Sequence, residues 1–205
     1  ARKPLVLRGA RQVGKTWLVR DLAKRTGKEL VELNFEQDSL WGDCFVDNDP
    51  AEILARVGLR RGQRVNPSSS LLFLDEIQAF TAGLAKLRWF AEQMPELPVI
   101  AAGSLLEFAL GEHGHSMPVG RIGIFNLDPL RFDEYLLAHG QDLLLEQLRR
   151  WAPGNALDSV VHERASAWME RFAMVGGMPS IAALDVEGTA SEALRDAQRQ
   201  LVATY

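Results

Sequence analysis

GARQVGKT is the stretch that decides the fold; it comprises Gly9, Ala10, Arg11, Gln12, Val13, Gly14, Lys15 and Thr16. It fits the pattern G-x-x-x-x-G-K-[ST] of a phosphate-binding loop, which requires a strand before it and a helix after it. Both are predicted here, because a short apolar run occupies Leu5–Arg8 and a helical pattern follows over Lys15–Arg25. The stretch therefore predicts that an α/β domain begins with a strand, a loop and a helix.

The residue types in this loop suit a phosphate chain with a bound cation. Glycines allow positive φ and let the backbone pass close to phosphate oxygens, and successive N–H groups at a helix N-terminus attract an anion. Lys15 adds a cation for the β- and γ-phosphates, and Thr16 offers a hydroxyl oxygen to Mg²⁺. We therefore expect residues 9–16 to bind a nucleoside triphosphate rather than to form a glycine-rich turn without a ligand.

A second signal lies about sixty residues further on, in the run LLFLDE at residues 71–76. Four apolar residues predict a strand that is buried on both faces, and Asp75 and Glu76 follow at its carboxyl end, where ligands bind in parallel α/β sheets. Asp75 suits binding of Mg²⁺ through the water molecules around the ion, and Glu76 suits activation of a water molecule that attacks the γ-phosphate. The pair favours hydrolysis over transfer of the phosphoryl group to a small molecule.

Strands and helices alternate through the first part of the chain, which predicts a parallel sheet sandwiched by helices. The expected strands are Leu5–Arg8, Glu29–Phe35, Leu71–Leu74, Val99–Ala102 and Ile122–Leu127. The expected helices between them include Lys15–Arg25, Pro50–Arg61 and Gly83–Met94. We place residues 1–129 in a core domain of the P-loop type.

After Pro129 only helical patterns follow, so we expect residues 130–205 to form a small, incomplete helical lid. The predicted helices are Arg131–His139, Asp142–Trp151, Asp158–Val175 and Thr189–Tyr205. Gly176–Pro179, which reads GGMP, predicts a helix stop and a turn. Thr189 and Glu192 have the spacing of a capping box for the last helix.

Composition excludes several classes of protein. The net charge of −4 argues against a nucleic-acid binder with a basic surface, and Cys44 is the only cysteine, so no internal disulfide forms. No apolar run is long enough to cross a bilayer, and we expect a cytoplasmic protein. Because an apolar strand pattern begins at once and a helical pattern continues to the end, we also expect N- and C-terminal regions beyond this piece.

The motifs in combination resemble a known group of proteins. GARQVGKT, LLFLDEIQ, VIAAGS and GRIGIFNLDPLRFDEYL occur in the order and spacing of prokaryotic AAA+-type P-loop ATPases that are related to archaeal-type ATPases and carry a C-terminal domain of unknown function. The resemblance covers residues 4–135 and implies ATP as the nucleotide. It also implies the sheet order 5-1-4-3-2, in which the strand before Gly103 lies between the strand of the P-loop and the strand of Asp75.

The resemblance also assigns roles to two further residues. Ser104 matches the sensor-1 position, where its hydroxyl contacts the γ-phosphate or the attacking water; the alternative is an N-cap for a helix over Leu105–Leu110. Arg121 matches the position of an arginine finger; the alternative is a surface arginine at a strand end. No sensor-2 arginine is matched, and Arg164 and Arg171 are its candidates.

Three functions are compatible with these signals. The first is an ATPase that uses hydrolysis with Mg²⁺ to change the conformation of an unknown protein partner. Assembly of this ATPase into a homo-oligomer is compatible with the sequence. The second is a nucleotide-gated binding module with negligible turnover. The third is a P-loop kinase for a small molecule, against which the Asp75–Glu76 pair argues. Phosphate release without an acceptor separates the first from the third, and turnover separates the first from the second.

Overall fold

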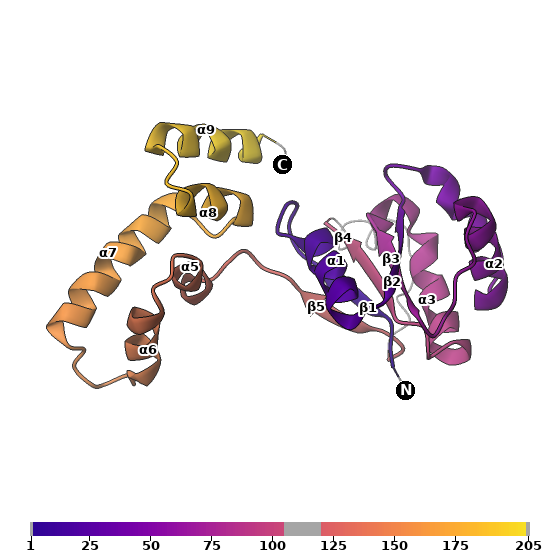
Figure 1. Ribbon diagram of the computed structural model, residues 1–205, viewed down its shortest axis with the longest axis horizontal. Coiled ribbons are helices and arrows are strands. Elements are labelled where there is room, and N and C mark those ends of the chain that lie inside the picture. Colours follow the sequence, from indigo (N-terminus) through magenta and orange to yellow (C-terminus); the bar gives the residue numbers. More distant parts are fainter. Residues whose placement is uncertain (1, 105–119, 204–205) are drawn as a thin grey trace. The chain divides into compact units, whose positions relative to one another are not determined.

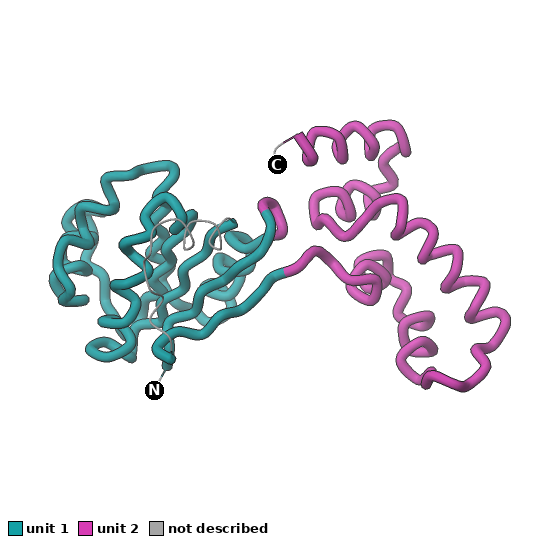
Figure 2. Tube along the Cα trace, turned by 180° about the vertical axis from the view of Figure 1, so that it is seen from behind, with its two compact units in different colours: residues 1–10, 14–127 teal, residues 11–13, 128–205 magenta. Residues whose placement is uncertain are grey.

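The computed structural model describes residues 2–104 and 120–203. The chain divides into two compact units, which Figure 2 shows in different colours: residues 1–10 and 14–127 form the first, and residues 11–13 and 128–205 form the second. We call them the sheet unit and the helical unit. Each unit is described by itself.

The sheet unit is built on five parallel strands in the order β2-β3-β4-β1-β5 (Figure 1). The strands are β1 (Leu5–Arg8), β2 (Glu29–Asn34), β3 (Ser70–Asp75), β4 (Val99–Gly103) and β5 (Gly123–Asn126). This is the expected order 5-1-4-3-2 counted from the opposite edge, so the predicted α/β sheet is confirmed. Parallel pairing of Arg8 with Gly103 and of Leu74 with Ala101 brings the carboxyl ends of β1, β3 and β4 to one edge.

Helices cover both faces of this sheet. The α-helices are α1 (Lys15–Thr26), α2 (Pro50–Arg61) and α3 (Ala82–Gln93), with 3₁₀ helices η1 (Ser39–Phe45) and η2 (Ile77–Phe80). Alternate residues of β3 separate the two cores: Leu72 and Leu74 pack with residues of α2 and α3, whereas Leu71 and Phe73 pack with Val19 of α1. Burial on both faces explains why β3 is apolar at successive positions.

Local sequence fixes the ends of these helices. Asp49 accepts a hydrogen bond from the N–H of Ala51 at 2.8 Å, and Pro50 follows at the first helical position of α2. Gly27 and Gly62 end α1 and α2 in the left-handed conformation. The short helices η1 and η2 were not expected from the sequence. They carry Phe45 and Phe80, whose rings pack against each other and against the ring of Phe35. This ring packing depends on contacts between distant segments, so no periodic pattern in the sequence predicts the two helices.

The helical unit has five described helices. They are α5 (Phe132–Ala138), α6 (Asp142–Arg150), α7 (Ser159–Val175), α8 (Pro179–Val186) and α9 (Ser191–Val202). Four of them match the predicted helices. The expected turn at GGMP is correct for Gly176, where α7 ends, but Pro179 is the first residue of the unexpected helix α8. The predicted capping box of Thr189 and Glu192 is wrong, because the N-cap of α9 is Ala190 and no side chain caps it.

A buried polar cluster joins three of these helices. Asp185 of α8, which is only 4% exposed, accepts hydrogen bonds from Tyr135 Oη at 2.5 Å and from Arg171 Nη2 at 2.9 Å, and it lies 3.0 Å from His139 Nε2. Burial by itself raises the pKa of Asp185, but the bonds from Arg171 and Tyr135 outweigh it and hold the pKa below its ordinary value. Arg171 thus has a structural partner inside its own unit.

Gly177 in the GGMP stretch meets the segment that leads into α5. The N–H of Leu130 donates to the carbonyl oxygen of Gly177 at 2.7 Å, and a Cβ at Gly177 would overlap the Leu130 carbonyl oxygen. Backbone oxygen cannot move aside as the end of a side chain can. Gly177 is therefore required by close approach of two backbone segments.

Gly177→Ala should lower the free energy of unfolding by about 1–3 kcal/mol, the usual cost of forcing an extra methyl group into a packed site. Thermal and urea unfolding followed by circular dichroism measure this change. Gly123→Ala is the matched control, since the nearest side-chain atom there is Leu5 Cδ1 at 3.5 Å, an ordinary contact. Equal stability of the two variants would show that Leu130 does not constrain Gly177.

Candidate active site

The predicted phosphate-binding loop connects β1 to α1 and has the backbone that such a loop requires. Gly9, Gln12 and Gly14 have φ values of 149°, 59° and 98°. Gly14 is the N-cap of α1, and no atom lies within 4 Å of a Cβ built on it, so its glycine is required by conformation rather than by space. The first turn of α1 follows at once, with the N–H of Leu18 donating to the Gly14 carbonyl at 2.9 Å.

Lys15 lies inside this loop rather than on the surface. Its side chain is buried, with 6% of the residue exposed. The Nζ atom donates to the carbonyl oxygens of Gly9 at 2.9 Å and Ala10 at 2.7 Å. The start of α1 is thereby tied to the end of β1, and an ammonium group is held where the loop backbone turns.

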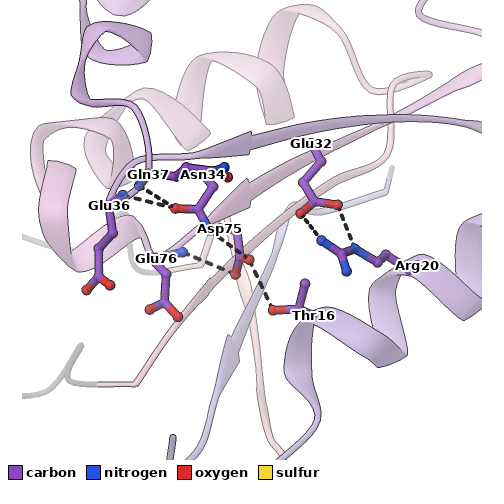
Figure 3. Close-up of polar contacts among 8 residues, drawn as sticks. All are labelled: Thr16, Arg20, Glu32, Asn34, Glu36, Gln37, Asp75 and Glu76. Carbon is purple, nitrogen blue, oxygen red and sulfur yellow. Dashed lines mark hydrogen bonds and ion pairs between the residues drawn. The ribbon is translucent and has the colours of Figure 1, made fainter. Parts of the chain in front are cut away.

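Thr16 and Asp75 meet although 59 residues separate them in the sequence (Figure 3). Thr16 Oγ1, on the first turn of α1, donates to Asp75 Oδ2, at the end of β3, at 3.0 Å. Asn34 Nδ2, at the end of β2, approaches the same oxygen at 3.4 Å, and the N–H of Glu76 donates to Asp75 Oδ1 at 3.2 Å. Three elements thus converge on one carboxylate.

The Asp75 carboxylate is held in a buried environment. The residue is 3% exposed, and this burial raises its pKa above the ordinary value, while the bond from Thr16 acts in the opposite direction. A hydroxyl and a desolvated carboxylate side by side are hard oxygen ligands of the kind that Mg²⁺ binds in P-loop proteins. The residues present therefore fit the predicted metal site of Thr16 and Asp75.

Glu76 follows in a conformation that is rare for its residue type. Its φ of 50° and ψ of 46° lie in the left-handed region, and it is the N-cap of η2. Figure 3 shows its carboxylate pointing away from Asp75, beside that of Glu36. Glu76 Oε2 accepts a hydrogen bond from Gln78 Nε2 at 2.6 Å. A non-glycine residue in this region has a strained backbone, and residues with strained backbones are found most often at active sites.

Ser104 follows the end of β4 at the same edge of the sheet. Its Oγ atom is buried and has no hydrogen-bond partner among the described residues. The alternative role of Ser104 as an N-cap depends on a helix over residues 105–110, which lie outside the described residues. A buried hydroxyl at this edge remains a candidate for contact with the substrate.

Arg121 does not lie at this edge within its own sheet unit. It precedes β5, whose Gly123 pairs with Leu5, whereas Gly9 follows the other end of β1. Arg121 therefore lies at the amino ends of β1 and β5, whereas Gly9 lies at the carboxyl end of β1. Arg121 Nη2 forms an ion pair with Glu92 at 3.3 Å. Of the two sensor-2 candidates, Arg171 binds Asp185 and Arg164 donates to Gln141 at 2.9 Å.

Sequence reasoning missed three residues of this site: Asn34, Glu36 and Gln78. Asn34 carried a usable signal, because it is a polar residue at the carboxyl end of a predicted strand, the edge at which ligands bind. Gln78 Nε2 contacts Glu36 Oε1 as well as Glu76. Glu36 and Gln78 carried no such signal, since Glu36 lies in a turn and Gln78 in the short helix η2, and neither segment has a periodic pattern.

A glycine-containing loop between a strand and a helix, with a lysine inside it and a threonine bonded to an aspartate at the end of a buried parallel strand, defines the class of P-loop nucleoside triphosphatases. A family model described as an AAA domain matches residues 1–136 of this chain. The chain therefore belongs to the AAA domain family and contains a P-loop ATPase domain of this type. No curated protein matches the chain. Among the described residues, no helix is long and apolar enough to cross a membrane.

The raised pKa of Asp75 predicts a specific dependence of stability on pH. A carboxyl group that binds its proton more tightly in the folded state gains stability as the pH falls. The free energy of unfolding of the wild type, minus that of Asp75→Asn, should rise as the pH is lowered from 7 toward the ordinary value of 3.8. Urea unfolding without divalent cations measures this difference. A difference that falls on acidification would contradict the desolvation of Asp75.

Proposed function

We propose that this chain binds ATP with Mg²⁺ at residues 9–16 and hydrolyses it, and that hydrolysis changes the conformation of the helical unit and acts on a protein partner. The observation that carries the proposal is the 3.0 Å bond between Thr16 and Asp75. It joins the helix of the phosphate loop to the acidic strand end, so both ligands of a phosphate-bound cation lie in one place.

Binding of the triphosphate uses groups that already face the loop. Backbone N–H groups of Gly9, Ala10, Arg11, Gln12, Val13 and Gly14 surround the phosphates in this proposal. Lys15 leaves the carbonyl oxygens of Gly9 and Ala10 and turns its ammonium group to the β- and γ-phosphates. Thr16 and Asp75 would hold Mg²⁺, which would neutralise charge on the phosphate oxygens.

Hydrolysis needs a base near the γ-phosphate, and Glu76 is the proposed one. Its carboxylate accepts a proton from water as the water oxygen attacks the γ-phosphorus, and the bond from phosphorus to the β–γ bridging oxygen breaks to give ADP and phosphate. Ser104 offers its buried hydroxyl to the γ-phosphate or to the attacking water. Activation of water favours hydrolysis over transfer to a small-molecule acceptor, because a kinase has to exclude attacking water.

Glu76→Gln should bind ATP with an unchanged dissociation constant and hydrolyse it at least about a hundredfold more slowly, because the amide keeps the shape of the carboxylate and loses the base. Phosphate release under saturating ATP measures turnover, and calorimetry measures binding. Lys15→Ala serves as the companion variant: it should lose ATP binding while its circular dichroism spectrum stays that of the wild type.

The two variants separate the alternatives for this site. Normal turnover in Glu76→Gln removes the base from the mechanism and leaves a nucleotide-gated binding module. ATP affinity unchanged in a folded Lys15→Ala contradicts the phosphate-binding loop itself. Wild-type phosphate release that requires a small-molecule acceptor supports a kinase instead.

Arg121 lies too far from the phosphate loop of its own chain to act there, so we propose that it acts at the site of a second copy of the chain. The proposal therefore includes a homo-oligomer. Its position at the amino end of β5, opposite the edge of Gly9, supports an arginine finger that reaches the site of a neighbouring subunit. The side chain of Arg121 is 57% exposed and pairs with an exposed surface group, so it is accessible to a neighbour. Hydrolysis then depends on assembly.

Arg121→Ala should lower turnover about a thousandfold, the scale of a lost arginine finger. When Arg121→Ala subunits are mixed with Glu76→Gln subunits, partial activity should return, because some interfaces pair an intact Glu76 with an intact Arg121. Arg88→Ala is the matched control, since Arg88 also binds Glu92, at 3.1 Å, and is similarly exposed. Mixed oligomers without recovered activity would contradict action between subunits.

A further inference from the structure

The Gln78 side chain holds two carboxylates at once. It extends from η2, and its Nε2 atom donates to Glu76 Oε2 at 2.6 Å and to Glu36 Oε1 at 2.9 Å. One carboxylate belongs to the proposed base, and the other comes from the turn after β2. The proposed mechanism so far gives Gln78 no role.

The two carboxylates dictate which way the Gln78 amide faces. An ionised carboxylate only accepts hydrogen bonds, whereas the amide nitrogen carries two N–H groups, one for each partner. Rotating the amide by half a turn would place Oε1 against two negative oxygens. In the observed orientation Oε1 is buried and has no hydrogen-bond partner among the described residues. Leaving a buried acceptor without a partner is unfavourable, so the amide orientation is set by the two bonds at Nε2.

Glu76 requires support of this kind because of its backbone. Glu76 has a φ of 50°, and a non-glycine residue in this left-handed region is strained and persists only where the surroundings hold it. Two contacts do so here: the Glu76 N–H donates to Asp75 Oδ1, and the Glu76 carboxylate accepts from Gln78. Its backbone is thus fixed by the proposed metal ligand and its side chain by Gln78.

Glu36 is itself fixed by the same strand ends. Asn34 Oδ1 accepts the N–H groups of Glu36 at 3.1 Å and of Gln37 at 2.8 Å, while Asn34 Nδ2 approaches Asp75 Oδ2. Hydrogen bonds therefore run from Asp75 through Asn34, Glu36, Gln78 and Glu76 and return to Asp75. Figure 3 shows the Asn34 and Asp75 parts of this closed circuit. No member can rotate without breaking a bond to its neighbour.

We propose that Gln78 is a positioning residue for the Glu76 carboxylate and that Glu36 anchors the Gln78 amide. The inference rests on the proposed function, in which Glu76 accepts the proton of the attacking water. Gln78 acts through Glu76 and does not touch the substrate. Its loss leaves the phosphate loop and the Thr16–Asp75 pair intact and misplaces the base.

Gln78→Ala should lower kcat about tenfold to a hundredfold, the scale for a displaced catalytic group, while the ATP dissociation constant stays within about twofold of the wild type. Gln78→Glu should lower kcat likewise, since it keeps the shape but replaces the two N–H donors by a third carboxylate. Gln63→Ala, in an exposed loop of the same unit, is the matched control and should keep the kcat of the wild type.

Epistasis distinguishes positioning from a structural role. Glu36 is exposed, so Glu36→Ala leaves the fold intact, and it should lower kcat in the same direction but less. The double variant Gln78→Ala with Glu36→Ala should turn over no more slowly than Gln78→Ala alone. In a Glu76→Gln background, Gln78→Ala should cause no further loss, because the residue through which it acts is already disabled.

The outcomes separate this inference from the function on which it rests. Normal turnover in Glu76→Gln overturns the proposed function. Slow turnover in Glu76→Gln together with wild-type kcat in Gln78→Ala overturns the positioning role alone. If Gln78→Ala shows no folded state in a melting experiment, Glu36→Ala and Gln78→Glu decide instead, and unchanged kcat in both variants contradicts the inference. If Gln78→Ala does fold, a loss of kcat that multiplies with the loss caused by Glu76→Gln also contradicts the inference.

Discussion

The hydrogen bond between Thr16 and Asp75 is the contact on which the rest of the sheet unit depends. Thr16 begins a helix and Asp75 ends a strand, so the bond forms only if β1 and β3 run in the same direction and end at the same level. Between them lies β4, which pairs with both. The apolar layer on one face of the sheet, in which Val19 of α1 packs with Leu71 and Phe73, then fixes the height of α1 over these strand ends.

This contact places a carboxylate where its charged form is disfavoured. Burial raises the pKa of Asp75, and the neutral donors Thr16 and Asn34 offset only part of the desolvation. A divalent cation offsets the remainder far better than a hydroxyl or an amide does. Burial of Asp75 therefore costs stability in the folded state without a cation, and the same desolvation would strengthen binding of the proposed cation.

Most of the sheet unit was predictable because its signals are local or periodic. Leu71–Leu74 is apolar at every position because β3 is covered on both faces, and the loop at Gly9–Thr16 has a fixed spacing. The strand order came from the family resemblance, since pairing across the sheet leaves no local trace. Gln78 and Glu36 were missed because their contact joins the helix η2 to a turn 42 residues away, and α8 was missed because GGMP ends one helix and begins another.

The circuit of hydrogen bonds restricts the orientation of the Glu76 carboxylate relative to Asp75. Asp75 and Glu76 are adjacent in sequence, yet the peptide bond between them leaves the Glu76 side chain free to rotate. The path through Asn34, Glu36 and Gln78 removes that freedom, since it fixes the carboxylate relative to the same aspartate from a second direction. Part of that path is at the surface, where Glu36 and Gln37 are exposed. A displacement of this turn therefore reaches the Glu76 carboxylate through two hydrogen bonds, from Glu36 to Gln78 and from Gln78 to Glu76.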